Sequence, residues 1–162
     1  MNERFHEIAL QVNGEKVSER VDARTTLVDF LRERLALTGS HVGCEHGVCG
    51  ACSVRVNGAV VRGCLMLAVQ CNGMQVTTIE GVARTDEIAD LQRAFIERNA
   101  LQCGYCTPGM LLTAQELLNA SGVPSREAIR AYLSGNYCRC TGYQAIIDAV
   151  EAVAHARAGA QR

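Results

Sequence analysis

The segment Gln102-Cys103-Gly104-Tyr105-Cys106-Thr107-Pro108-Gly109 places two cysteines just ahead of a predicted helix. Thr107 and Pro108 are residue types preferred at the N-cap and at the first position of a helix. A helix N-terminus carries partial positive charge and free N–H groups, which favour a bound anion such as a thiolate. A lone C-x-x-C motif is ambiguous between a redox dithiol, a zinc site and a cluster site.

The cysteine pattern returns at Cys138-Arg139-Cys140-Thr141-Gly142, again directly before a predicted helix. Two cysteine pairs, each at the start of a helix, can close one four-sulfur site. The sequence therefore predicts one metal centre with these ligands, here called the second cysteine set: Cys103, Cys106, Cys138 and Cys140. Taken alone, two close pairs fit zinc nearly as well as an iron–sulfur cluster, and a redox dithiol stays open.

Four cysteines earlier in the chain form the first cysteine set: Cys44, Cys49, Cys52 and Cys64. The first three have the C-x₄-C-x₂-C spacing of plant-type [2Fe-2S] ferredoxins, and the fourth lies downstream. Glycines at 43, 47 and 50 leave the backbone uncrowded and permit positive φ angles around a cluster. Zinc ribbons and fingers favour two short-spaced pairs, so this spacing favours a [2Fe-2S] cluster over zinc.

Composition excludes several classes of protein. With 48% hydrophobic and 20% charged residues among 162, the chain is predicted to fold, as one domain or two small ones. A net charge of −1 without a basic stripe predicts no nucleic-acid partner. No apolar run approaches the roughly 20 residues of a membrane helix, and no targeting signal appears, so a cytoplasmic location is expected. Nine cysteines in a reducing cytosol indicate metal ligation, while Cys71, without partner spacing, is predicted to be a buried small residue.

The first half of the chain is predicted to form a small mixed sheet packed on one helix. Alternating apolar residues from 8 to 12, followed by the turn Asn13-Gly14, predict a hairpin. Apolar residues at helical spacing predict a helix over 27–35. Three further strands are predicted, the first two joined by a tight turn: 53–56, 59–62 and 75–79.

The second half changes to a helical pattern. Four helices with short links indicate a small bundle, over 88–98, 110–118, 126–133 and 145 to about 155. Thr141 to Gln144 has capping-box spacing before the last helix. The small, polar residues after 155 are predicted to fray. The composition shift near residues 80–86 predicts a boundary between two domains, 1–82 and 83–162.

Three segments together resemble the small iron–sulfur subunit of the molybdenum hydroxylase family: GCEHGVCGAC, QCGYCTPGM and GNYCRCTGY. This family includes xanthine dehydrogenase, aldehyde oxidoreductase, carbon monoxide dehydrogenase and bacterial dehydrogenases of N-heteroaromatic compounds. The likeness covers nearly the whole chain, and all eight predicted ligand positions match. It implies an α+β protein, with an N-terminal β-grasp [2Fe-2S] ferredoxin-like domain followed by an all-α four-helix-bundle [2Fe-2S] domain.

The resemblance also implies partners and a path for electrons. A large subunit would carry molybdenum on molybdopterin, as the cytosine dinucleotide, and a medium subunit would carry FAD, in a heterotrimer or a dimer of heterotrimers. Electrons would pass from molybdopterin through the cluster of the second cysteine set, then that of the first, to FAD. Gln102 and Cys140 would contact the pterin by hydrogen bonds. No substrate site or catalytic residue is expected in this chain.

Two alternatives remain at this point. An autonomous two-cluster ferredoxin would be stable and monodisperse by itself, whereas a subunit would behave poorly without its partners. A zinc-stabilised interaction module would be colourless and would hold about one zinc per four-cysteine site. The substrate of the complex and its terminal electron acceptor are set outside this sequence.

Overall fold

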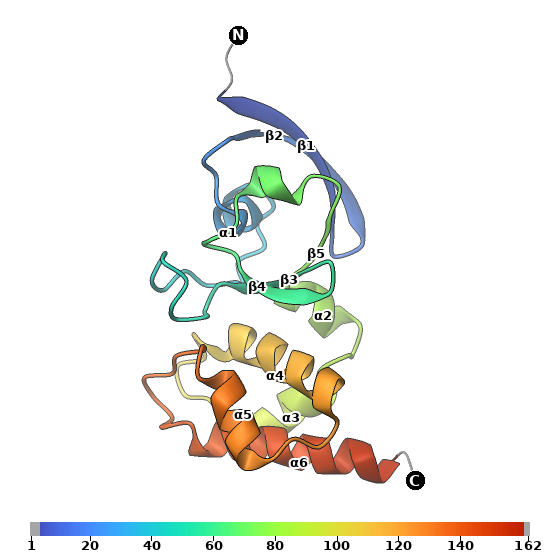
Figure 1. Ribbon diagram of the computed structural model, residues 1–162, viewed down its shortest axis with the longest axis vertical. Coiled ribbons are helices and arrows are strands. Elements are labelled where there is room, and N and C mark those ends of the chain that lie inside the picture. Colours follow the sequence, from blue (N-terminus) through green and yellow to red (C-terminus); the bar gives the residue numbers. More distant parts are fainter. Residues whose placement is uncertain (1–3, 161–162) are drawn as a thin grey trace.

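The computed structural model describes residues 4–160, in which a mixed sheet stands above a group of helices (Figure 1). The sheet has the order β2-β1-β5-β3-β4. Its strands are β1 (Phe5–Val12), β2 (Glu15–Asp22), β3 (Ser53–Val56), β4 (Ala59–Arg62) and β5 (Gln75–Thr77). β1 runs parallel to β5, and every other neighbouring pair is antiparallel.

The two predicted hairpins follow from their turns. Asn13 and Gly14 have φ angles of 52° and 86°, and Asn57 and Gly58 have φ angles of 48° and 90°. Two successive positive φ angles are those of a type I′ turn, whose twist matches that of the strands it joins. β3 and β4 therefore occupy the predicted ranges 53–56 and 59–62.

The core beneath the sheet centres on the segment predicted as a helix over 27–35. It consists of one α-helical turn, α1 (Leu27–Asp29), continued by a wider helical turn, η1 (Phe30–Arg34). Thr26 caps the start by accepting a hydrogen bond from the Asp29 N–H. A short 3₁₀ helix that no pattern predicted, η2 (Ala68–Cys71), closes this core and buries Cys71 completely.

The second half of the chain is helical. Its helices are α2 (Ile79–Arg84), α3 (Ala89–Glu97), α4 (Thr107–Ser121), α5 (Arg126–Leu133) and α6 (Gln144–Ala160). α4 contacts β3 and β4 on one side and α2, α3 and α5 on others. A helix that is apolar all round belongs in the interior, and α4 buries residues from Gly109 to Leu118 with one exception, Glu116.

Four local expectations are corrected by the structure. The strand predicted over 75–79 ends at Thr77, because α2 begins at Ile79. The helix predicted over 110–118 starts earlier, with Cys106 rather than Thr107 at its N-cap. The Thr141–Gln144 capping box does not form, because the Thr141 hydroxyl contacts the Cys138 sulfur and the Tyr143 N–H. The tail predicted to fray is helical to Ala160, and residues 161–162 lie outside the described part.

The sheet and the helices meet along β3, β4 and α4 (Figure 1). The Arg55 guanidinium donates two hydrogen bonds to the Glu87 carboxylate, at 2.9 and 3.1 Å. The Val60 N–H donates to the Glu116 carboxylate at 2.7 Å. These bonds satisfy polar groups that the two halves would otherwise bury against each other.

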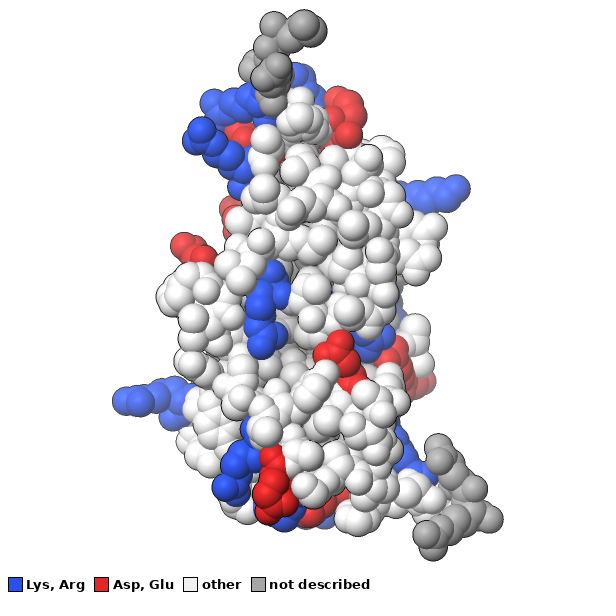
Figure 2. All heavy atoms as spheres, viewed as in Figure 1, with Lys and Arg blue, Asp and Glu red and all other residues white. Residues whose placement is uncertain are grey.

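Among residues 4–160, no helix is long and apolar enough to cross a membrane. On the face shown in Figure 2, acidic and basic side chains lie close together near both ends of the molecule. Much of the surface between those ends is uncharged.

Candidate metal centres

The second cysteine set comes together where the loops before α4 and α6 meet. The Sγ atoms of Cys103 and Cys140 lie 3.6 Å apart. The thiols of Cys106 and Cys138 are close enough for each to shift the pKa of the other. Each contact joins one cysteine from each C-x-x-C or C-x-C motif, so the four thiols form two pairs that bridge the two loops.

This pairing bears on the kind of metal group that fits. In a four-cysteine [2Fe-2S] site each of the two irons takes two thiolates, and two adjacent thiol pairs provide them. Within the described residues, no group of three His, Cys, Asp or Glu side chains is arranged to hold a single metal ion.

The surroundings of the second cysteine set favour the thiolate at Cys138 and disfavour it at Cys106 and Cys140. Burial raises the pKa of Cys138, but the hydroxyl and N–H of Thr141, at 3.1 and 3.4 Å from its Sγ, together with the Cys140 N–H and the Cys106 thiol, leave that pKa lowered. Burial and the neighbouring Cys138 thiol raise the pKa of Cys106 to about 12. The Cys103 thiol raises the pKa of Cys140. A bound metal cation removes this conflict, because it holds coordinating thiols deprotonated.

The two pairs of the second set differ in depth. Cys103 and Cys140 are exposed, whereas Cys106 and Cys138 are half-buried. The Gln102 side-chain amide donates to the Cys140 carbonyl at 3.1 Å, which brings together the two residues predicted to contact a pterin. The exposed pair therefore lies at the surface, with Gln102 beside it.

The first cysteine set is built by one compact loop and the residues that follow β4. The Cys49 N–H lies 3.4 Å from Cys44 Sγ, and the Cys64 N–H lies 3.4 Å from Cys52 Sγ. Backbone N–H groups, that of Cys49 foremost, lower the pKa of Cys44 to about 6, whereas burial raises the pKa of Cys52 to about 11. Cys52 and Cys64 are buried, and Cys44 and Cys49 are half-buried. The N–H groups of Cys49 and Cys64 thus each lie beside the sulfur of another cysteine of this set, as suits thiolates that hold a [2Fe-2S] cluster.

The glycines of this loop are needed where they stand. A Cβ on Gly43 would lie 3.0 Å from the Cys49 sulfur. Gly47 has a φ of 82°, and a Cβ there would collide with the Leu65 side chain. The loop backbone at Gly43 thus lies close to the Cys49 sulfur, and Gly47 supplies a positive φ, as expected for a backbone that wraps a small anionic cluster.

The two cysteine sets are neighbours, and direct hydrogen bonds join their loops on one side of the molecule (Figure 1). The Tyr137 N–H, one residue before Cys138, donates to the Cys49 carbonyl at 2.8 Å. The Tyr105 hydroxyl, between Cys103 and Cys106, donates to the Val42 carbonyl at 2.8 Å.

Comparisons with known proteins agree with this geometry. One family model, described as "2Fe-2S iron-sulfur cluster binding domain", matches residues 10–71, and another, "[2Fe-2S] binding domain", matches residues 78–151. Caffeine dehydrogenase subunit gamma from Pseudomonas sp. (strain CBB1) is 52% identical over 151 residues, which cover 91% of this chain and 90% of the relative. The nicotine 6-hydroxylase small subunit of Paenarthrobacter nicotinovorans is 51% identical over 144 residues, which cover 89% and 87%. A chain of quinoline 2-oxidoreductase from Pseudomonas putida 86 superimposes with a TM-score of 0.90 at 44% identity, covering 98% of both chains.

The chain belongs to the small iron–sulfur subunits of the molybdenum hydroxylase family. The resemblance inferred from its three cysteine segments is confirmed, as is the α+β class. As a member of this family, the chain is an oxidoreductase subunit for electron transfer, with two [2Fe-2S] binding domains.

Sequence reasoning missed the residues that join the two sites of this iron–sulfur subunit. Asn136 is buried between the loops, and Arg62, at the end of β4, reaches across to the Gly135 carbonyl at 2.8 Å. Neither residue lies in a ligand spacing or an apolar period. The only local signal was the position of Asn136 two residues before Cys138.

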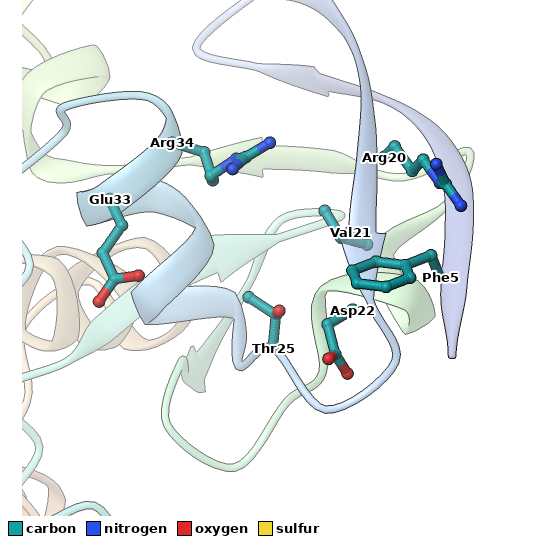
Figure 3. Close-up of a pocket in the computed structure, with 7 residues that line it drawn as sticks. All are labelled: Phe5, Arg20, Val21, Asp22, Thr25, Glu33 and Arg34. Carbon is teal, nitrogen blue, oxygen red and sulfur yellow. The ribbon is translucent and has the colours of Figure 1, made fainter. Parts of the chain in front are cut away.

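The iron–sulfur subunit also has a surface hollow away from the cysteines, at the far end of the sheet (Figure 3). It is lined by Phe5, Arg20, Val21, Asp22, Thr25, Glu33 and Arg34. Arg34 pairs with Glu19 at 3.5 Å, and the Arg20 guanidinium lies over the Phe5 ring, 5.1 Å from its centre. Both arginines that line the hollow are thus engaged by neighbouring side chains. No cysteine lines the hollow.

Proposed function

We propose that this chain is the electron-transfer subunit of a multi-subunit molybdenum hydroxylase. It would carry electrons from a molybdopterin cytosine dinucleotide centre in a large subunit to FAD in a medium subunit. Two [2Fe-2S] clusters would relay them. The eight ligands would be Cys103, Cys106, Cys138 and Cys140 for the cluster next to the pterin, and Cys44, Cys49, Cys52 and Cys64 for the cluster next to FAD.

The observation that carries this proposal is the continuous arrangement of the two cysteine sets. The exposed pair of the second set leads to its half-buried pair, which adjoins the first set through the bond from Tyr137 to Cys49. Redox cofactors perform the electron chemistry, and a protein contributes their spacing, orientation and surroundings. A relay between two partner subunits needs a cluster site that a partner can reach at the surface, and it needs a second cluster site held close to the first.

Gln102 and Cys140 are the proposed pterin contacts. Because Gln102 uses its amide N–H to hold the Cys140 carbonyl, its side-chain oxygen remains available as an acceptor for a pterin N–H. Cys140 would then be both a cluster ligand and a contact to the electron donor. A residue in both roles keeps the gap between donor and acceptor short.

The proposed FAD subunit would cover the other end of the relay. Leu65 is 63% exposed and Val48 is 43% exposed, and both belong to the first cysteine set's surroundings. Exposed apolar side chains beside a cofactor site suit contact with a partner subunit. The uncharged area in Figure 2 fits such contacts too, because charged residues are depleted in interface cores.

Several finer features belong to the same proposal. The domains would be 1–82, with a β-grasp arrangement, and 83–162, with a four-helix bundle. The complex would be cytoplasmic and would assemble as a heterotrimer or a dimer of heterotrimers. Because caffeine, nicotine and quinoline appear in the relatives' names, we infer an N-heterocyclic substrate for the large subunit.

The proposal is tested with Gln102→Ala in the complete complex. We expect slower reduction of the clusters by substrate and unchanged reduction by dithionite, because Gln102 is a proposed pterin contact and is not itself a cluster ligand. Gln11→Ala, an exposed glutamine on β1, is the control and should leave both reactions at wild-type rates. Substrate-driven reduction of Gln102→Ala at the wild-type rate would refute the pterin contact.

A further inference from the structure

A buried amide lies between the loops that carry the two cysteine sets. The Asn136 side chain is 1% exposed. Its Nδ2 donates to the Gly50 carbonyl at 3.3 Å, and its Oδ1 lies 3.1 Å from the Thr113 hydroxyl of α4. Gly50 directly follows Cys49, and Asn136 lies two residues before Cys138, so this one side chain joins both ligand loops and a central helix.

Arg62 completes a network around the same carbonyl. Its guanidinium donates to the Gly135 carbonyl at 2.8 Å and to the Ser53 hydroxyl at 2.6 Å. The Ser53 hydroxyl in turn donates to the Gly50 carbonyl at 2.7 Å. Networks of buried hydrogen bonds that are fully satisfied rigidify a structure and specify one arrangement.

Two glycines show how closely the loops approach at this point. A Cβ on Gly50 would lie 2.6 Å from the Gly135 carbonyl oxygen and 2.7 Å from Asn136 Nδ2. A Cβ on Gly109, in the first turn of α4, would collide with the Gly50 carbonyl. The junction has room for backbone and the Asn136 amide, and for nothing larger.

We propose that Asn136 is a positioning residue that sets the spacing of the two clusters. It holds the Cys49–Gly50 backbone against the Asn136–Cys138 backbone, so that the Tyr137 N–H and the Cys49 carbonyl form a direct link between the two ligand sets. Arg62 supports the same junction by donating to the Gly135 carbonyl and to Ser53, whose hydroxyl donates to the Gly50 carbonyl. This inference rests on the proposed electron-transfer function and adds the residue that fixes the distance between the two redox centres.

The test compares Asn136→Ala and wild type in the complex produced with both partner subunits. Iron per chain is measured first, and low-temperature electron paramagnetic resonance is then recorded with both clusters reduced. The magnetic interaction of two reduced clusters falls with the cube of their separation, so it reports spacing directly. We expect Asn136→Ala to keep its iron and to show a reduced or blurred splitting.

Two further variants separate positioning from general stability. Ile129→Ala creates a cavity at a fully buried position of α5, outside the hydrogen-bond network of Asn136 and Arg62, so it should keep the wild-type splitting. Arg62→Met keeps an apolar stem but loses both donors, and it should alter the splitting as Asn136→Ala does. If Asn136→Ala assembles without iron, the splitting of Arg62→Met shows whether the network positions the clusters.

Wild-type splitting in an iron-loaded Asn136→Ala or Arg62→Met complex would overturn the inference, and so would an equal change of the splitting in Ile129→Ala. Loss of iron in both Asn136→Ala and Arg62→Met would overturn it as well, because the network would then be needed for folding. A wild-type complex with two clusters and no splitting would also overturn it. A wild-type complex without two clusters would refute the proposed function instead.

Discussion

The two cysteine sites of this subunit each bring four thiols together, but they do so with different parts of the chain. The first set comes mostly from a single loop of small residues, and its sulfurs receive N–H groups from within the set. The second set joins two loops that are distant in sequence, each leading into a helix, α4 or α6. The first set buries Cys52 and Cys64, whereas the second exposes Cys103 and Cys140.

This difference separates local from tertiary requirements. The first site depends on backbone conformation near each sulfur, which glycines permit. The second depends on packing, because α5 contacts both α4 and α6, and this arrangement places the loop ahead of α6 beside the loop ahead of α4. Disturbing one site should therefore spare the other, except at the junction that they share.

The largest expected effect tests that independence. Cys103→Ser should lose about two of about four irons per chain and one paramagnetic signal, because each [2Fe-2S] cluster needs its own four ligands. The signal that remains should match that of the first cysteine set. Iron analysis and electron paramagnetic resonance of the reduced complex measure this. Loss of both signals in a folded complex, or of neither, would contradict the assignment of ligands to separate sites.

A smaller effect is expected at the junction. Gly50→Ala should destabilise the chain by roughly 1–3 kcal/mol through overpacking against Gly135 and Asn136, in addition to about 1–2 kcal/mol for an alanine at a φ of 73°. Gly58→Ala shares the positive φ, but nothing lies within 4 Å of its new Cβ. The denaturant midpoints of both variants measure the difference. Equal midpoints would show that the close approach of the loops is unimportant.

The smallest effect concerns the ion pair that joins the two halves. The hydrogen bonds from Arg55 hold the pKa of Glu87 below the ordinary value of 4.5. A lowered folded-state pKa gives stability that is present above the unfolded-state value and lost as pH falls below it. Glu87→Gln should therefore cost about 1 kcal/mol near neutral pH, and its difference from wild type should shrink below pH 4.5.

The measurement for Glu87 is the denaturant midpoint, followed by circular dichroism across this pH range. Loss of the clusters in acid affects wild type and variant alike, so the difference between them isolates the ion pair. Glu97→Gln, an exposed residue at the end of α3, is the matched control. A gap between wild type and Glu87→Gln that is constant with pH would contradict this account.

The sequence predicted those parts of the fold that have local causes. Asn13-Gly14 and Asn57-Gly58 specify their turns by themselves, and the Ser125 cap defines the start of α5, whose range 126–133 was predicted correctly. α2 was missed because the residues around 80–86 were interpreted only as a boundary between two domains. In the structure, Gly81 lies inside the helix, against the Asn13 side chain. That contact joins residues far apart in sequence, so no local pattern could show it.

The candidate sites divide in the same way. The cysteine spacings predicted which thiols would come together, because ligand spacing reflects the geometry of the cluster itself. The role of Asn136 depends on a tertiary contact to Gly50, 86 residues away, whereas that of Thr141 depends on the conformation of a loop that brings it to Cys138, three residues away. Thr141 looked like a helix cap because its residue type and its spacing to Gln144 fit one. Its proximity to a sulfur became evident only in the structure.

The most direct test of the account is the metal content and magnetism of the complex purified with its partner subunits and reduced with dithionite. We expect about four irons per chain of this subunit and two distinct paramagnetic signals, one for each cysteine set. A sample that is magnetically silent and contains zinc would contradict the account, because the cysteines would then be structural and the chain would carry no electrons.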